Sequence, residues 1–267
     1  MKKDLIVIKV GGSVVTDKDK VNPTPRLDVI TNLTKQVKKV YSSKKYSLVL
    51  VHGAGSFAHP LAKKYNLHQG MKTKEQKLGM ALTHQSLYNL NKLVLSALIK
   101  QSLPAITLTP HSFITQSGGK LNDFNYQIIK DLLGKDLIPL LYGDVVLDNK
   151  WGCSILSGDT IVSYLAKKLK AKKVIFLSDV DGIYDCDPKK NPHAKLIPLI
   201  NNQNFKKVLA GITSTNKDDV TDEMRGKILS IKNNLAGAKV IIINGFKQIS
   251  LDLVVDGHQL GTRLEFS

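Results

Sequence analysis

The chain is poor in cysteine and arginine, and it lacks long apolar runs. Its 267 residues include two cysteines, Cys153 and Cys186, which form no metal-type cluster. We therefore expect neither a disulfide framework nor a structural zinc site, and free thiols indicate a cytoplasmic protein. The longest apolar runs have only the length of a strand, so we expect no membrane helix and no signal peptide.

Acidic residues are also scarce, because 39 Lys+Arg face 22 Asp+Glu and give a formal net charge of +17. Lysine supplies this excess in scattered doublets, and only Arg26, Arg225 and Arg263 are arginines. The sequence has no arginine-rich stripe or aromatic platform of the kind that nucleic-acid binders use. We therefore expect no nucleic-acid partner, although the positive field would favour a polyphosphate substrate.

Short apolar runs alternate with helical patterns along the chain. Runs rich in Val, Ile and Leu predict buried strands at 4–10, 46–52, 104–109, 137–143, 173–179 and 239–244. Helical periodicity predicts helices at 25–40, 74–100, 125–134, 159–170 and 221–236. The alternation predicts an α/β fold, specifically an αβα sandwich with a mostly parallel central sheet. We expect a single domain over 1–267, in which lobes of about 1–150 and 151–267 share one sheet.

Glycines, lysines and aspartates gather at the ends of these predicted strands. The stretches are KVGGSVVTDK (9–18), HGAGSFAH (52–59), GDVVLD (143–148), ILSGD (155–159) and SDVDG (178–182). Ligands of such sheets bind beyond the carboxyl ends of the strands. Bare amides and lysines neutralise phosphate charge there, and carboxylates hold Mg²⁺ or orient the lysines. The pattern favours phosphoryl transfer, although the P-loop, protein-kinase and dinucleotide signatures are missing from the sequence.

These motifs, together with SDVDGIYDCDP (178–188) and DVTDEMRGK (219–227), resemble in order and spacing those of the amino acid kinase superfamily. The histidine loop HGAGSFAH is most similar to that of the isopentenyl phosphate kinases, with fosfomycin kinase as a close relative. The resemblance covers nearly the whole chain, to GTRL at 261–264. It implies an ATP-dependent kinase that phosphorylates isopentenyl phosphate and acts as a homodimer. Mg²⁺ is expected because it screens the β- and γ-phosphates, and the short apolar runs lead us to expect no membrane partner.

The resemblance also implies roles for individual residues on the nucleotide side. Lys18 would stabilise the transferring phosphoryl group, and Asp159 would keep the two lysines, Lys9 and Lys18, aimed. Residues expected to bind ATP are Lys9, Gly11, Gly12, Ser13, Gly55, Asp179, Gly182 and Lys227.

On the acceptor side, the resemblance implies that His59 hydrogen-bonds the monophosphate. Residues expected to bind this substrate are Ala54, Gly55, His59 and Gly158, whereas no residue is assigned to a metal. A monophosphate has a second pKa of about 6, so its oxygen needs no strong general base. The expected catalytic residues are Lys9, Lys18, His59 and Asp159.

Several of these residues also have ordinary structural interpretations. Asp159 fits the N-cap of the following helix, and Lys227 fits a solvated lysine. His52 is better read as a strand-end histidine bonded to backbone. The apolar helix at 78–98 could wall an acceptor pocket, through Met80 and His84, or pack in the core. Four aspartates have two interpretations, either as turn residues or as residues that contact a metal or the nucleotide: Asp144, Asp148, Asp179 and Asp181.

The chain departs from the family pattern in the last motif, where Asp222 and Glu223 replace two glycines near the nucleotide. Carboxylates there would repel ATP unless they point to solvent or help to hold Mg²⁺ or the adenosine hydroxyls. Ala58 also replaces a glycine, which is a smaller change. Asp222, Glu223 and the basic surface motivate one rival, a catalytically silent nucleotide-binding regulator. Another rival, which would use the same glycine loops, is a kinase for another small phosphate or phosphonate such as fosfomycin.

Overall fold

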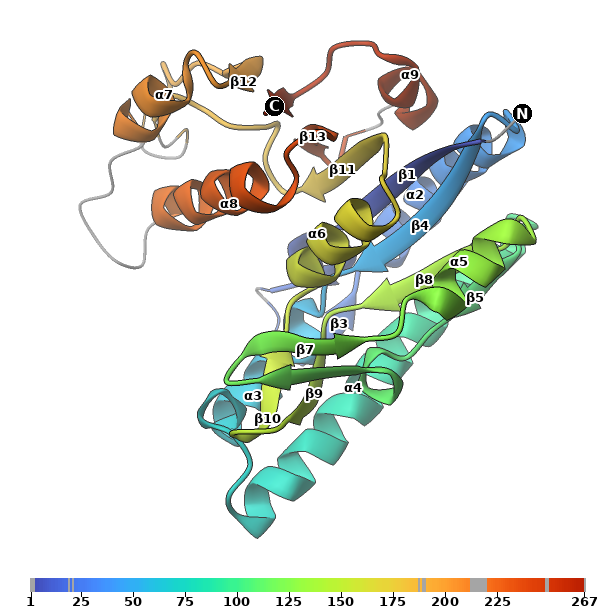
Figure 1. Cartoon of the computed structure of the whole chain (residues 1–267), viewed down its shortest axis with the longest axis vertical. Helices are drawn as coiled ribbons and strands as arrows, with labels where there is room; N and C mark the ends of the chain where they lie inside the picture. Colours follow the sequence, from blue (N-terminus) through green and yellow to red (C-terminus); the bar gives the residue numbers. More distant parts are fainter. Residues whose placement is uncertain are drawn as a thin grey trace.

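The structure is a computed structural model of the whole chain (Figure 1). It describes residues 3–18, 20, 22–186, 188, 191–211, 220–247 and 250–266, with the side chains of 220–224 excepted. Both termini lie at the same end of the molecule, beside α9 (Leu251–Asp256). At the opposite end lies the N-terminal half of the long helix α4 (Lys74–Lys100).

An eight-stranded sheet runs through both halves of the chain in the order β12-β14-β13-β11-β1-β4-β8-β5. Neighbouring strands are parallel except at β13 and β14, which pair antiparallel. In that order the strands are Leu199–Asn201, Thr262–Glu265, Lys239–Asn244, Lys173–Ser178, Asp4–Val10, Tyr46–His52, Ile138–Tyr142 and Ala105–Thr107. The predicted, mostly parallel central sheet is confirmed.

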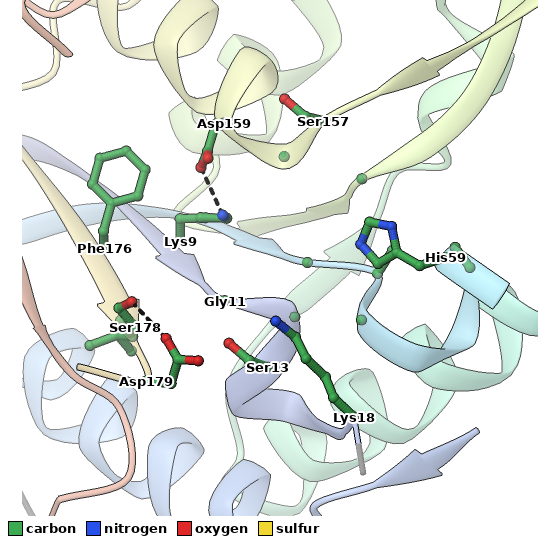
Figure 2. Close-up of a pocket in the computed structure, with 18 of the residues that line it drawn as sticks. Lys9, Gly11, Ser13, Lys18, His59, Ser157, Asp159, Phe176, Ser178 and Asp179 are labelled. Atoms are coloured by element: carbon green, nitrogen blue, oxygen red, sulfur yellow. Dashed lines mark hydrogen bonds and ion pairs between the residues drawn. The ribbon is translucent and has the colours of Figure 1, made fainter. Parts of the chain in front are cut away.

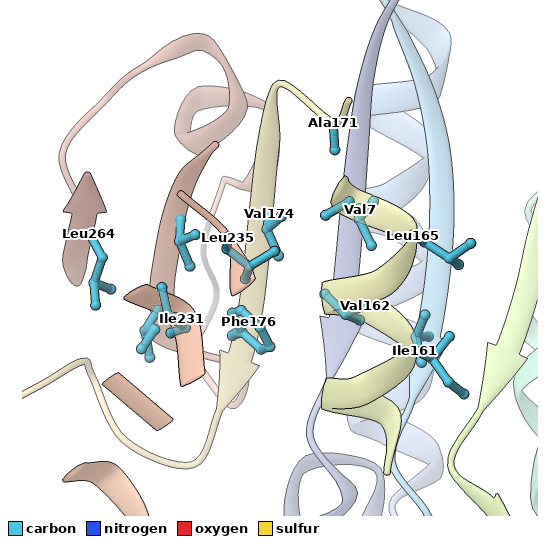
Figure 3. Packing of buried hydrophobic residues seen from close by; sticks show 14 of the residues in the cluster. Val7, Ile161, Val162, Leu165, Ala171, Val174, Phe176, Ile231, Leu235 and Leu264 are labelled. Atoms are coloured by element: carbon cyan, nitrogen blue, oxygen red, sulfur yellow. The ribbon is translucent and has the colours of Figure 1, made fainter. Parts of the chain in front are cut away.

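Helices cover both faces of this sheet because successive side chains of a strand point to opposite sides. In β1, Val7 packs on one face, whereas Ile6 and Ile8 pack on the other. The Val7 face is covered by α5 (Gln127–Gly134), α6 (Gly158–Lys168) and α8 (Val220–Asn234), as Figure 3 shows for α6 and its neighbours. The opposite face is covered by α2 (Leu27–Ser42), α4 and α9. The αβα sandwich is therefore confirmed.

A second sheet of four strands, which the sequence did not predict, lies beside the N-terminal half of α4 (Figure 1). Its order is β10-β9-β6-β7, with bounds Gly152–Leu156, Asp144–Asp148, Ile114–Ser117 and Lys120–Phe124. The buried carboxylate of Asp148 fixes the turns of this second sheet, because it accepts hydrogen bonds from four backbone amides, those of Gly118, Gly119, Lys150 and Trp151. Burial alone would raise the pKa of Asp148, but these four donors lower it. Asp148, the last residue of β9, thus has the structural role of fixing these turns.

The remaining elements are short and mostly lie in the connections around the sheet ends. They are α1 (Gly12–Val15), β2 (Thr16–Asp17), β3 (Thr24–Pro25), α3 (His59–Lys64), α7 (Phe205–Gly211), and the 3₁₀ turns η1 (Gly55–Phe57), η2 (Leu67–Gln69) and η3 (Pro110–Ser112). Among the described residues, no helix has the length and apolar character needed to cross a membrane.

Candidate active site

A cleft of about 590 Å³ opens beyond the carboxyl ends of β1, β4, β8 and β11. Loops far apart in the sequence meet there because parallel strands end at the same edge of a sheet. The predicted site residues that line the cleft are Lys9, Gly11, Gly12, Ser13, Lys18, Ala54, Gly55, His59, Gly158, Asp159, Asp179 and Lys227. Gly182 is not among the lining residues.

Lys9 and Asp159 form an ion pair on one wall of the cleft (Figure 2). Lys9 comes from β1 and Asp159 from the first turn of α6, and their Nζ and Oδ1 atoms lie 2.7 Å apart. Gly158 lies beside them, because a Cβ there would be in ordinary contact with Cε of Lys9, at 3.6 Å. The ion pair holds the ammonium group of Lys9 in the cleft, as expected for a lysine that meets a phosphate.

Asp159 is not the N-cap of α6. Ser157 occupies that position, and its hydroxyl accepts the amide of Thr160 over 3.1 Å. Burial alone would raise the pKa of Asp159, but the positive charges of Lys9 and Lys227 hold it below its ordinary value. The carboxylate therefore stays ionised at neutral pH and can orient cations.

Lys227 reaches the cleft from α8. Its Nζ lies 5.3 Å from the ring centroid of Phe176, a cleft residue on β11. This contact and the attraction to Asp159 anchor a lysine that the sequence alone could have left in solvent. Lys9 and Lys227 thus approach the same carboxylate from two elements of the fold.

Thr16, which sequence reasoning missed, joins the two glycine loops. Its buried hydroxyl donates to the carbonyl of Gly12 over 2.8 Å and accepts the amide of Ser56 over 3.0 Å. A Cβ on Gly12 would lie 2.5 Å from the amide nitrogen of Gly55, and Gly55 has φ +51°, a conformation that favours glycine. The loops after β1 and β4 are therefore held in direct contact, with their bare backbones toward the cleft.

Replacement of Thr16 by valine is expected to lower the free energy of unfolding by about 1–3 kcal/mol, because the buried amide of Ser56 loses its acceptor. Urea denaturation of the purified variant measures this change. Thr31→Val is the matched control, because the Thr31 hydroxyl also donates to a carbonyl four residues earlier but is exposed on α2. Equal losses in both variants would show that the bridge between the loops contributes nothing.

Ser13, Lys18 and His59 face the part of the cleft opposite the ion pair (Figure 2). Ser13 lies in α1, whose first amides have no acceptor within the helix. The amine of Lys18 points into the space between Ser13 and His59, and His59 begins α3 directly after the second glycine loop. Donors therefore surround one space from three directions, which suits a charged phosphate.

His52 has the structural role expected from the sequence. It is buried at the end of β4, stacks on Tyr142 with ring centroids 5.4 Å apart, and its Nδ1 lies 3.0 Å from the carbonyl of Gly53. Burial lowers the pKa of His52, so the ring is neutral at physiological pH. His52 does not line the cleft.

The aspartates left open by the sequence fall into two groups. Asp144 and Asp179 line the cleft, and the Asp179 carboxylate accepts the Ser178 hydroxyl over 3.3 Å. Asp148 and Asp181 lie outside the cleft lining, and Asp181 accepts hydrogen bonds from Lys247 and Asn244.

Gly182 has a structural reason to be glycine. Its φ is +154°, and a Cβ there would lie 2.6 Å from Oγ1 of Thr262. The hydroxyl of Thr262 accepts the amide of Ile183 over 2.7 Å, which fixes the turn after β11. The nucleotide contact expected of Gly182 stays a prediction.

Arg26 is a cleft residue that the sequence did not suggest. Its guanidinium pairs with Asp17 at 3.1 Å, donates to the carbonyl of Thr16, and lies 5.4 Å from the ring centroid of Phe246. The signal that could have identified it is its rarity, as one of only three arginines in the chain. Its charge is already paired with Asp17, so we assign it no phosphate contact.

An apolar side of the cleft lies next to His59. It is formed by Ala58, Ala62, Val145 and Ile155. Met80 packs behind it against the buried cluster that contains Ala62 and Val145, and neither Met80 nor His84 lines the cleft. The side chains of Asp222 and Glu223 lie outside the described residues, so their effect on the nucleotide stays a prediction.

Comparison with known proteins agrees with this geometry. The model of the amino acid kinase family matches residues 4–244. The isopentenyl phosphate kinase of Methanothermobacter thermautotrophicus is 35% identical over 230 residues, covering 84% of each chain. That of Methanocaldococcus jannaschii is 33% identical over 270 residues, covering 98% of this chain and 99% of the relative. A solved isopentenyl phosphate kinase structure, 30% identical, superposes with a TM-score of 0.83 over 97% of this chain and 99% of that chain.

Proposed function

The chain belongs to the amino acid kinase family, and from this premise we propose that it transfers the γ-phosphoryl group of ATP to isopentenyl phosphate. The products are ADP and isopentenyl diphosphate. The observation that carries the proposal is the cleft itself, where the Lys9–Asp159 pair and His59 face one space beside the two glycine loops. Isopentenyl phosphate kinases that match nearly the whole chain support this choice of acceptor.

Charge repulsion is the main obstacle to this reaction. The acceptor oxygen is already an anion at neutral pH, because the second pKa of a monophosphate is about 6. No residue has to remove a proton before attack. The protein must instead bring two phosphates together and stabilise the charge that spreads over the transferring group.

The nucleotide side of the cleft holds ATP in this proposal. The amides of Gly12 and Ser13 bind the phosphates at the end of β1, and Lys9 neutralises their charge. The amide of Gly11 already donates to the carbonyl of Leu177 over 2.8 Å, so Gly11 would contribute by its lack of a side chain. Lys227 reaches the β- and γ-phosphates from α8, while Asp159 keeps both cations oriented. Lys18 stabilises the transferring group in this proposal, because its amine points into the space between Ser13 and His59 (Figure 2).

The acceptor side holds isopentenyl phosphate. Ala54 and Gly55 offer amides at the loop after β4, and His59 donates a hydrogen bond to the monophosphate. Gly158 leaves room for the acceptor beside Lys9. The hydrocarbon group then lies against the apolar side of the cleft, formed by Ala58, Ala62, Val145 and Ile155.

Mg²⁺ would bind with the nucleotide and screen its β- and γ-phosphates. Protein sites for Mg²⁺ usually supply one or two carboxylates, with phosphates and water completing the shell. Asp179 fits this need, because its carboxylate lines the cleft and its described partner is a neutral hydroxyl. Asp159 fits less well, because Lys9 already pairs with it.

The lobes, partners and location remain parts of the same proposal. Residues of about 1–150 form the acceptor lobe, and 151–267 form the nucleotide lobe. A homodimer follows from the family resemblance, and a cytoplasmic location from the two free cysteines. The scattered lysine excess supports a small anionic substrate and no nucleic-acid partner.

The proposal is tested by ADP release from Mg-ATP with four acceptors: isopentenyl phosphate, dimethylallyl phosphate, fosfomycin and none. We expect saturable turnover with isopentenyl phosphate and much weaker turnover with fosfomycin. If fosfomycin were the preferred acceptor, the proposed acceptor would be wrong, whereas the proposed phosphoryl transfer in the cleft would stand. ATP binding without turnover for any acceptor would instead favour a silent regulator.

A further inference from the structure

Outside the phosphate-facing part of the cleft, a buried carboxylate lies between two histidines. Asp144 begins β9, and its side chain is completely buried. Its Oδ2 accepts the Nδ1 and backbone N–H of His111 over 2.9 and 3.2 Å, and its Oδ1 accepts the amide of Val145 over 2.9 Å. His84 approaches from α4, with Nδ1 only 3.0 Å from Oδ1. Three elements therefore bring two imidazoles to one carboxylate.

The Nδ1 atom of His84 is buried and makes only a poorly aligned contact with Asp144. It lies within hydrogen-bond distance of Asp144 Oδ1, so the ring nitrogen must point beside that oxygen instead of at it. The His84 and His111 ring centroids are 4.1 Å apart. Each of the three residues offers one ligand atom, a ring nitrogen or a carboxylate oxygen, and these three atoms all lie within 4.8 Å of one another.

We propose that His84, His111 and Asp144 form a binding site for a divalent transition-metal ion of the zinc type. Two imidazole nitrogens and a carboxylate are ligands that such ions prefer, and a cation would give the nitrogen of His84 a better-aligned partner than Asp144 does. The backbone amides of His111 and Val145 already orient the carboxylate, as outer-shell donors do in metal sites. His84 and His111 are 20% and 36% exposed, which leaves a path for the ion and a fourth position for water.

The site is distinct from that of the nucleotide's Mg²⁺, because Mg²⁺ prefers oxygen ligands. It is also independent of the proposed kinase activity. A bound ion would tie α4, η3 and β9 together at one point. Asp144 and Val145 line the cleft, so the ion would fix the position of that part of its wall.

The test is a Co²⁺ titration of the untagged protein without nucleotide, followed by displacement with Zn²⁺. We expect one Co²⁺ per chain, visible absorption bands of a low-coordinate ion, and loss of these bands when Zn²⁺ is added. Affinity in His84→Gln and His111→Gln is expected to fall by more than about 10–100-fold, the loss that outer-shell changes alone produce. His193→Gln, at an exposed histidine of this chain, is the matched control and should bind like the parent protein.

Zn²⁺ should also raise the melting temperature of the parent protein and not that of the two glutamine variants. Circular dichroism checks their folding, and His111→Gln alone decides the test if His84→Gln disturbs α4. Failure of the parent protein to bind Co²⁺ in a one-to-one ratio would overturn the proposal. Equal affinity of the parent protein and His111→Gln would overturn it as well.

Discussion

The Lys9→Ala variant is expected to lose about 10²–10³-fold in kcat for ATP-dependent phosphorylation of isopentenyl phosphate. Lys9 is held in the cleft by a 2.7 Å ion pair with Asp159, next to the glycines that face the phosphates. A cation preorganised in this way stabilises charge in the transition state more than in bound ATP. Steady-state ADP release at saturating ATP and acceptor measures the effect.

Asp159→Asn provides a second arm of this experiment. It removes the charge that orients Lys9, so its loss and that of Lys9→Ala should be strongly non-additive in the double variant. Lys120→Ala is the control, because Lys120 is an exposed lysine of β7, outside the cleft. Near-normal kcat in Lys9→Ala would contradict the role assigned to the ion pair.

His59→Ala is expected to reduce kcat/KM for isopentenyl phosphate by about 10²-fold, while the KM for ATP changes little. The histidine begins α3 on the acceptor side of the cleft and is assigned a hydrogen bond to the monophosphate. His59→Gln retains a hydrogen-bond donor and should lose less. Initial rates over a range of acceptor concentrations separate the two substrates.

His258→Ala is the matched control for that experiment, because His258 is exposed and lies outside the cleft. A rise in the KM for ATP, with acceptor kinetics unchanged, would place His59 on the nucleotide side. Unchanged kinetic constants for both substrates would show that His59 contacts neither of them. Either result would require a different donor for the acceptor phosphate.

The main sheet could be predicted from the sequence because its strands are buried on both faces and read as continuous apolar runs. Predicted strands 4–10 and 46–52 coincide with β1 and β4. The four-stranded second sheet gave no such signal. Its strand β7 is polar and largely exposed, and the contacts of Asp148 in β9 with the amides of Gly118 and Gly119 join residues about thirty positions apart.

The cleft could be predicted to the extent that its residues follow strand ends. Parallel strands bring Lys9, the loop after His52 and Asp179 to one edge of the sheet, and this placement does not depend on the order of the other elements. Asp144 was among the four aspartates singled out, but pairings that depend on tertiary contacts were missed. Thr16 bridges two loops 40 residues apart, and Asp144 meets His111 across 33 residues, so neither pairing has a local pattern.

The central claim is that the cleft passes a phosphoryl group from ATP to isopentenyl phosphate. Phosphorus NMR of the purified protein with Mg-ATP and isopentenyl phosphate tests it most directly, because each phosphorus atom is followed through the reaction. The account predicts equal amounts of ADP and isopentenyl diphosphate, with both products absent in Lys9→Ala over the same interval. ADP accompanied only by inorganic phosphate, or unchanged ATP under conditions in which ATP binds, would contradict it.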